Sequence, residues 1–408
     1  MRTAVFCAAV AAVLAPVCAG AQSPPLSEAD ALARLSSESP RVRAIRAAIE
    51  VARADVLAAG RYPNPRITFD REAVAGTTEY LTRVGQALPV TGYRGLQGQA
   101  ASLMVEAATS RADEEIRRAR ADLRQAFAQL VAAQTREREL AAARERLQGV
   151  ADVLARREAA GDAAGFDRLR AEREVLDLEV DRATAATERT RAQAALAGFF
   201  IGPVDPSTLV AAPSAPLTDT LPTIEALVER AEANRGELTA LRKETESAQV
   251  AGRAAERRWI PEPELVAGTK TSSSVGRGDV GSVFGVQATI PLFDRGQPER
   301  ALAQARASQA QARIEAFRQL LRAEIAGWRA AAIERRETAA RYRAAALDSA
   351  DQIERIAQVS YEAGERGILE LLDAYRTRST ARVRQAMLDA AVREAEIELE
   401  FVSGWEIR

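Results

Sequence analysis

Carboxylate and guanidinium side chains are the most abundant groups in this sequence that could do chemistry. The 408 residues include 57 Asp or Glu and 56 Lys or Arg but no His, and the two cysteines, Cys7 and Cys18, both fall within the first 21 residues. The rest of the chain therefore lacks imidazole bases, thiol nucleophiles and the usual zinc ligands. No set of nucleophile, base and orienting group stands out. We therefore expect a protein that is not an enzyme and holds no metal or cofactor.

The charge balance narrows the choice of partner. Basic and acidic residues nearly cancel, with a net charge of -1, so the chain has no general attraction for nucleic acid. Residues are 47% hydrophobic and 5% aromatic, which indicates a packed fold long enough for two ordinary domains.

The first residues predict an export signal over residues 1–21. Arg2 supplies a positive charge, Ala4 to Val17 is a run of apolar residues, and Ala19-Gly20-Ala21 offers a small-x-small cleavage site. The alternative is a lipoprotein signal acylated at Cys18, which Pro16 and Val17 disfavour. No later stretch approaches the ~20 apolar residues that a membrane-spanning helix needs, so any membrane crossing must use strands.

The chain repeats itself with a spacing of about 200 residues. Three pairs of segments carry the repeat. These are Pro63-Asn64-Pro65 with Pro261-Glu262-Pro263, Gln86 to Pro89 with Gln287 to Pro291, and Gly161 with Gly364. We therefore expect one repeat over residues 22–202 and a second over 223–403, joined by a Pro-rich connector at 203–222 and followed by a tail at 404–408.

Both repeats have the same predicted order of elements. Two short helices, as in Ser27 to Leu35 and Arg41 to Ala59, precede a β-hairpin at about 66–89 or 264–291. A long helical hairpin follows at about 93–200 or 296–402.

A seven-residue period in the long helical stretch predicts a coiled-coil seam. Apolar residues recur at Ile116, Leu123 and Leu130, at Ala126, Ala133, Leu140, Leu147 and Leu154, and in the second repeat at Ile314, Leu321 and Trp328. One helix from Gly95 to Glu158 would be about 95 Å long. A rod of that length must pack along others.

The four predicted strands have the length and alternation of membrane-spanning β-strands. Ser282, Phe284, Val286, Ala288 and Ile290 fall on one face of the last strand. Two soluble hairpins capping a helical bundle are the alternative. In lipid, four strands leave open edges, so the chain must assemble. Two copies would give a filled eight-stranded barrel, whereas three would give twelve strands with a lumen, continuous with a tube of long helices. That arrangement is a duct.

Three sets of residues give the sequence a resemblance to a known family. They are the duplicated Pro-x-Pro segments, Ile290 to Gly296 (IPLFDRG), and Tyr361 to Ala374 (YEAGERGILELLDA) at the second helical turn. From about Leu26 to Phe401 the chain resembles the TolC-like outer-membrane factors of bacterial efflux pumps, and within them the CzcC-like group associated with metal-ion export. The resemblance implies a mainly α-helical homotrimer with a twelve-stranded outer-membrane β-barrel and a periplasmic α-helical tunnel. It also implies two partners, a periplasmic adaptor and an inner-membrane transporter.

The resemblance also implies site residues at the tunnel tip. Glu370 and Asp373, three residues apart and so on one helix face, correspond to acidic rings that line the opening. Tyr361, Arg366 and Asp167 correspond to a latch that holds the tip closed, whereas Phe166 replaces a polar partner found in relatives. Gly161 and Gly364 correspond to the hairpin turns that contact the adaptor.

Other interpretations remain open at this point. A soluble periplasmic coiled-coil spacer or adaptor would explain the heptads but not four strands of membrane length, and a secreted adhesin or filament protein is a third possibility. Metal ions, drugs and dyes are all compatible substrates, because a duct passes whatever its transporter delivers.

Overall fold

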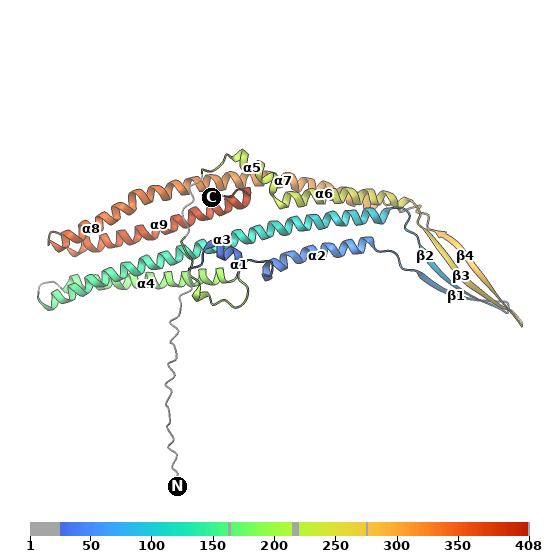
Figure 1. Cartoon of the computed structure of the whole chain (residues 1–408), viewed down its shortest axis with the longest axis horizontal. Helices are drawn as coiled ribbons and strands as arrows, with labels where there is room; N and C mark the ends of the chain where they lie inside the picture. Colours follow the sequence, from blue (N-terminus) through green and yellow to red (C-terminus); the bar gives the residue numbers. More distant parts are fainter. Residues whose placement is uncertain (1–24, 162–164, 214–219, 275, 407–408) are drawn as a thin grey trace, which may run out of the picture.

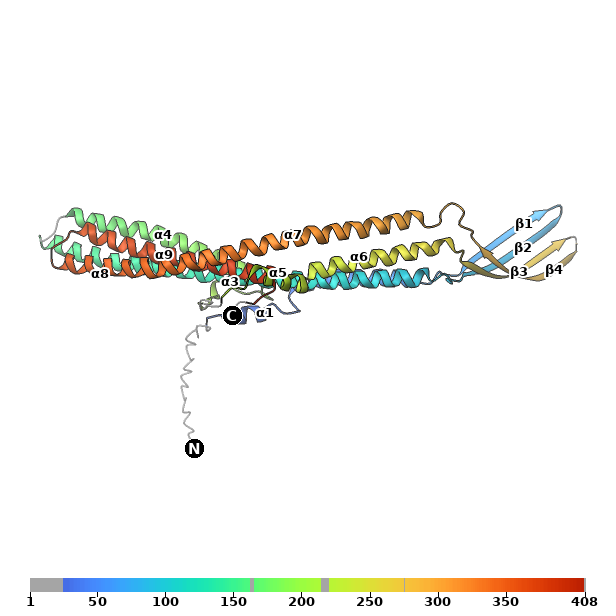
Figure 2. The same cartoon turned by 90° about the horizontal axis from the view of Figure 1, so that it is seen from above.

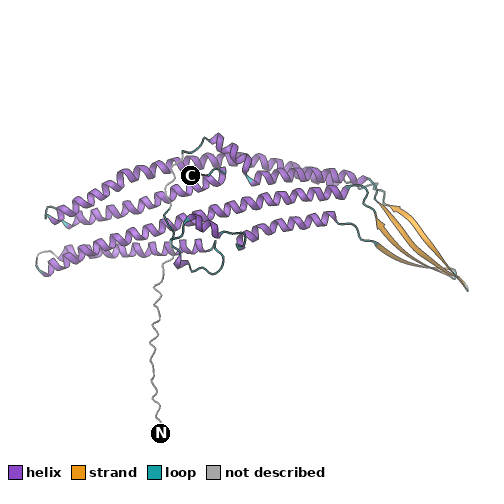
Figure 3. Ribbon diagram, viewed as in Figure 1, coloured by secondary structure: helices purple, strands orange, loops and turns teal. Residues whose placement is uncertain are grey.

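The computed structural model describes residues 25–161, 165–213, 220–274 and 276–406. The protein is elongated, with helical hairpins at one end and the strands at the other (Figure 1). Helices account for most of its length, and the strands lie together beyond them (Figure 3). The expected signal peptide, residues 1–21 with Cys7 and Cys18, lies outside the described residues. No helix in the described ranges is long and apolar enough to span a membrane.

The two repeats have the same order of elements. The first comprises α1 (Glu28–Arg34), α2 (Pro40–Gly60), β1 (Arg66–Val74), β2 (Thr77–Ala87), α3 (Tyr93–Ala159) and α4 (Gly165–Ala197). The second comprises α5 (Ile224–Asn234), α6 (Gly236–Ala255), β3 (Pro263–Ser274), β4 (Arg277–Ala288), α7 (Gln297–Tyr342), α8 (Asp348–Glu362) and α9 (Ile368–Ser403). Short 3-10 helices η1 (Pro206–Thr208) and η2 (Glu256–Trp259) lie in the connector and before β3.

Local sequence signals explain where the helices begin. Ser27 caps α1 by accepting a hydrogen bond from the backbone N–H of Asp30, and the Thr223 hydroxyl caps α5 in the same way at Ala226. Pro40 occupies the first position of α2, where its missing N–H costs nothing. Gly92 and Gly296, with φ of 73° and 84°, turn the chain from each sheet hairpin into α3 and α7.

The predicted heptad seam forms the helical core. Leu123 and Leu130 are fully buried with Phe127 in a mid-length cluster that includes residues of α1, α4 and the connector. Leu147 and Leu154 are buried in a second cluster near the hairpin turns, which we call the tip cluster. Leu321 is buried in a third cluster, where α5, α7 and α9 meet. Full burial of each such side chain contributes roughly 1.5–3 kcal/mol.

One difference between the repeats lies in the long helices. The helix α3 runs without interruption for 67 residues, whereas its counterpart is 46 residues of α7, a five-residue π-helical turn, η3 (Arg343–Leu347), and 15 residues of α8. Nothing in the local sequence predicts this turn, because Arg-Ala-Ala-Ala-Leu contains no Gly or Pro.

The four strands form one antiparallel sheet in the order β1-β2-β3-β4. Its two faces differ in chemistry, because side chains alternate along each strand. In the register Ile67↔Val84↔Ala267↔Phe284, one face carries exposed apolar residues: Ile67, Phe69, Val84, Leu265, Phe284 and Val286. The other carries charged residues, with ion pairs between Arg83 and Asp70 and between Lys270 and Glu79, each at 2.6 Å.

Candidate functional site

The hairpin turns at the helical end contain the two predicted glycines. Gly161 follows α3 and Gly364 follows α8, with φ of 84° and 73°, a conformation that side-chain-bearing residues rarely adopt. Apart from the immediate chain neighbours, no described atom lies within 4 Å of a Cβ built at either glycine, so the backbone conformation and not space selects Gly. Gly161 and Gly364 are both exposed, and α3, α4, α8 and α9 lie together at this end (Figure 2).

The two predicted ring residues lie on one exposed face of α9. Glu370 and Asp373 are exposed, whereas the intervening Leu371 and Leu372 are buried against α3 and α4 in the tip cluster. Packing therefore fixes which way this face of α9 points. In a single chain the two carboxylates are open to solvent.

The three predicted latch residues lie close to the turns but are not joined to one another. Tyr361 packs against the tip cluster, Arg366 is exposed in the turn, and Asp167 is in the first turn of α4. Within the described part of one chain, the ion pairs do not include Arg366 with Asp167. Phe166 is 66% exposed. A latch between these residues therefore remains a prediction about neighbouring hairpins.

A buried charge cluster that the sequence did not predict lies beside the tip. Glu354 of α8 is buried and pairs with Arg378 of α9 at 2.7 Å and Arg146 of α3 at 3.7 Å. Asp351 pairs with Arg378 and Arg382, and these bonds outweigh burial and lower its pKa. Burial raises the pKa of the neighbouring Tyr375, reinforced by the charge of Glu354.

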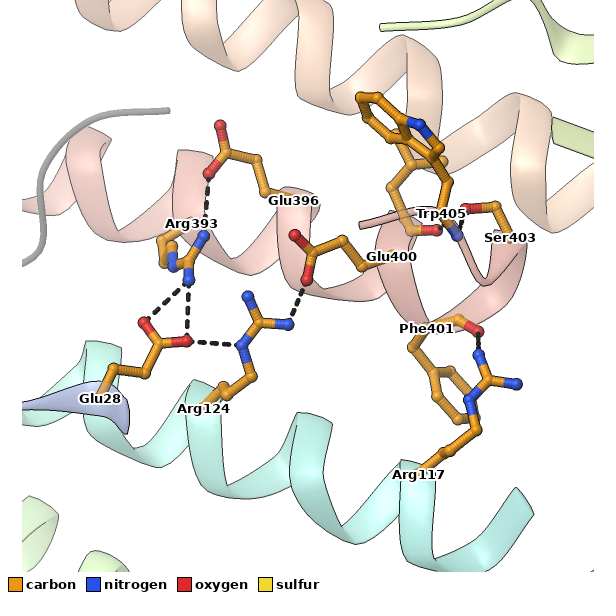
Figure 4. Close-up of polar contacts among 10 residues, drawn as sticks. Glu28, Arg117, Arg124, Arg393, Glu396, Glu400, Phe401, Ser403 and Trp405 are labelled. Atoms are coloured by element: carbon orange, nitrogen blue, oxygen red, sulfur yellow. Dashed lines mark hydrogen bonds and ion pairs between the residues drawn. The ribbon is translucent and has the colours of Figure 1, made fainter. Parts of the chain in front are cut away.

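A second unpredicted cluster joins the two repeats at mid-length. We call Glu28, Arg124, Arg336, Arg393, Glu396 and Glu400 the collar cluster; most of it is drawn in Figure 4. Arg393 donates to both oxygens of Glu28 at 2.8 Å, and Arg124 bridges Glu28 and Glu400. Burial disfavours the charged form of Glu28, but Arg393 and Arg124 outweigh it and lower its pKa.

A buried arginine at the start of α6 strengthens this junction. Arg235 is 6% exposed, pairs with Glu114 of α3 at 2.6 Å, and donates to the Val402 carbonyl at 3.1 Å. Its guanidinium also lies 5.0 Å from the ring centre of Phe401. The adjacent Gly236 lets α6 approach α3, because a Cβ there would be 2.3 Å from the Ser110 carbonyl oxygen.

The described residues contain no group of three or more His, Cys, Asp or Glu side chains placed to hold a metal ion. What the arrangement offers instead is a long scaffold with an amphipathic sheet at one end and exposed acidic residues near the other.

Comparison with known proteins shows what this scaffold is similar to. Residues 227–404, nearly all of the second repeat, match the family model described as outer membrane efflux protein. This region is therefore similar to that family. The resemblance inferred from residues 361–374, which lie inside the matched range, is thereby confirmed.

Relatives extend the likeness beyond the second repeat. The chain is 29% identical over 241 residues to the cobalt-zinc-cadmium resistance protein CzcC of Cupriavidus metallidurans, an alignment that covers 57% of this chain and about half, 55%, of that protein. A membrane protein from Pseudomonas aeruginosa has the same fold, with a TM-score of 0.76, 21% identity and coverage of 92% and 93% of the two chains. The structure of the open state of the Neisseria gonorrhoeae MtrE outer membrane channel is also similar, with a TM-score of 0.73 and 17% identity. The match covers 92% of this chain and 88% of that chain.

Proposed function

We propose that three copies of this chain form the outer-membrane exit duct of a tripartite efflux system. The observation that carries the proposal is the two-faced sheet at the end of the long helices. Its apolar face suits lipid and its charged face suits a water-filled lumen. The chain acts as a conduit and not as an enzyme.

The edges of the sheet support assembly. Among the described residues, β1 pairs with β2 alone and β4 with β3 alone, so this part of each chain presents two unpaired edges. Open edges are not tolerated in a bilayer, and joining β4 of one chain to β1 of the next satisfies both. Three chains then contribute twelve strands, enough to enclose a lumen.

Exposed residues where helices meet strands support a membrane boundary at this level. Tyr62, Trp259 and Phe293 are 71%, 61% and 93% exposed, and all lie next to the strands. Aromatic residues favour the membrane–water interface, where one side of the ring contacts lipid and the other water. The helices then extend into the periplasm.

The exposed turns at Gly161 and Gly364 are the proposed contact with a periplasmic adaptor, which links the duct to an inner-membrane transporter. The likeness to CzcC favours divalent metal cations as the cargo. The exposed carboxylates of Glu370 and Asp373 are compatible with cation passage.

Crosslinking in membranes and conductance in planar bilayers test this proposal. The expected product is a trimer that resists detergent, shifts mobility on heating and conducts ions. Crosslinking that saturates at dimers would contradict it. A soluble periplasmic spacer, the alternative function, would show neither heat-modifiable migration nor conductance.

A further inference from the structure

Ion pairs between the two repeats are unevenly distributed along the protein. Toward the sheet, Arg111 of α3 pairs with Glu237 and Glu244 of α6. At mid-length, Arg118 of α3 pairs with Glu398 of α9, in addition to the pairs of the collar cluster. Closer to the hairpin turns, the pairs that cross between repeats among the described residues are Arg146 with Glu354 and Arg376 with Glu174. The first is long, at 3.7 Å.

The pair of Arg376 and Glu174 has the geometry of a strong contact. Arg376 Nη2 lies 2.7 Å and 2.5 Å from the two Glu174 oxygens, and Nε lies 2.9 Å from one of them. A guanidinium and a carboxylate in this arrangement are held in a fixed orientation. The pair connects α9 directly to α4, and Arg376 is three residues beyond Asp373 on the same helix.

The same two residues line a cleft between the hairpins. The cleft has a volume of about 290 Å³ and is bounded by α3, α4 and α9, with Leu140, Leu147 and Leu178 among its apolar walls. Space of this size beside α9 gives the helix room to shift against α3 and α4 without overlap.

We propose that Arg376 and Glu174 are positioning residues that clasp α9 to α4 across this cleft and so set the width of the duct at Glu370 and Asp373. This inference rests on the proposed function. Arg376 is 63% exposed, so the clasp is weak enough to open when a partner docks. With the clasp released, α9 moves relative to the first repeat while the collar cluster holds the repeats together.

Conductance of the purified, full-length protein in planar bilayers tests the clasp. Glu174→Gln and Arg376→Gln should each raise the open probability about fivefold, the effect of losing one exposed bidentate pair. Exchanging the charges, with Glu174→Arg and Arg376→Glu together, should return it toward wild type. Asp181→Asn is the matched control, because Asp181 lines the same cleft on the same helix and is not among the described residues that pair with Arg376.

A distance measurement separates failure of the clasp from failure of the proposed duct. Spin labels on cysteines introduced at the exposed Leu169 and Leu369 report the separation of α4 and α9, in assemblies diluted with unlabelled chain. Glu174→Gln should widen the distance distribution and Asp181→Asn should not, whether or not the protein conducts. If Glu174→Gln leaves both distance and conductance like the control, the clasp is rejected. A widened distance without conductance in any variant rejects the duct and keeps the clasp.

Discussion

The collar cluster and the tip contain the same kinds of residue but use them differently. At the collar, Glu28, Arg124 and Arg393 are each no more than 20% exposed and bond to partners from the other repeat. At the tip, Glu370, Asp373 and Arg366 are exposed, and the pair of Arg376 and Glu174 is partly solvated. Desolvated ion pairs are costly to break, whereas exposed ones contribute about 0–1 kcal/mol.

The two regions are therefore suited to different roles. Contacts at the collar keep the two repeats in one arrangement, and contacts at the tip can be exchanged at small cost. The proposed duct would need both, because it would open at one end and stay sealed elsewhere. The largest effects of substitution are therefore expected at the buried junction between the repeats and the smallest at the tip.

Removing Arg235 should give the largest loss of stability. Arg235→Met removes the shorter of the two ion pairs of Glu114 and the bond to the Val402 carbonyl. Glu114 keeps a longer pair with Arg117, at 3.3 Å, and the Gly236 N–H, so the expected cost is about 3 kcal/mol. The measurement is chemical unfolding in detergent followed by circular dichroism. Arg173→Met is the control, because Arg173 is 68% exposed and pairs only along α4, and it should change stability by less than about 0.5 kcal/mol. Similar losses in the two variants would contradict the contrast.

Glu28→Gln should cost less, about 2 kcal/mol at neutral pH, because it weakens charged hydrogen bonds without emptying the site. The folded pKa of Glu28 lies below its ordinary value of 4.5, so its stabilising effect is present above pH 4.5 and is lost as pH falls through the folded pKa. The stabilities of wild type and variant, measured by thermal unfolding, should therefore converge as pH falls from 4.5 through the folded pKa. A difference that does not shrink at all as pH falls below 4.5, for as long as the protein stays folded, would mean that Glu28 is not the titrating group.

Much of this architecture could be predicted from the sequence because it depends on periodic patterns. The heptad residues Leu123 and Leu147 identified the buried seam, and the alternation around Phe284 identified the apolar face of β4. Turns were predictable because Gly161 and Gly364 are the residues that accept a positive φ. Each of these signals is local and can be recognised without knowing which helix packs beside it.

The ion-pair partners could not be predicted in the same way. The pairing of Arg393 with Glu28 joins residues 365 positions apart, and a chain with 56 basic and 57 acidic residues offers too many equivalent combinations. The π-helical turn was equally hidden, since Ala345 and its neighbours favour regular helix. Both features arise from packing between helices.

The latch residues should have a small effect on stability and a visible effect on conductance. Arg366→Ser removes an exposed charge at the tip, where a pair with Asp167 of a neighbouring hairpin contributes at most about 1 kcal/mol. Conductance in planar bilayers should rise, and rise further with Tyr361→Phe. Trimer content measured by crosslinking is the control and should not change. Wild-type conductance in the double variant would reject these residues as a latch.

The acidic pair should have the smallest effect on stability. Glu370 and Asp373 are exposed, so Glu370→Gln with Asp373→Asn should leave the free energy of unfolding within about 0.5 kcal/mol of wild type. Under threefold symmetry, however, they would place up to six carboxylates around one opening. The double variant should therefore lose cation selectivity and block by trivalent cations applied from the periplasmic side.

Salt dependence makes the last prediction specific. Because the carboxylates face water, their field is screened over the Debye length, which falls from ~10 Å at 0.1 M salt to ~3 Å at 1 M. Cation preference of the wild-type channel, measured from reversal potentials in a salt gradient, should weaken steadily over that range and approach the value of the double variant. A preference that survives 1 M salt would require desolvated charges, which the exposed face of α9 does not provide. Selectivity would then have to come from a more buried constriction elsewhere in the duct.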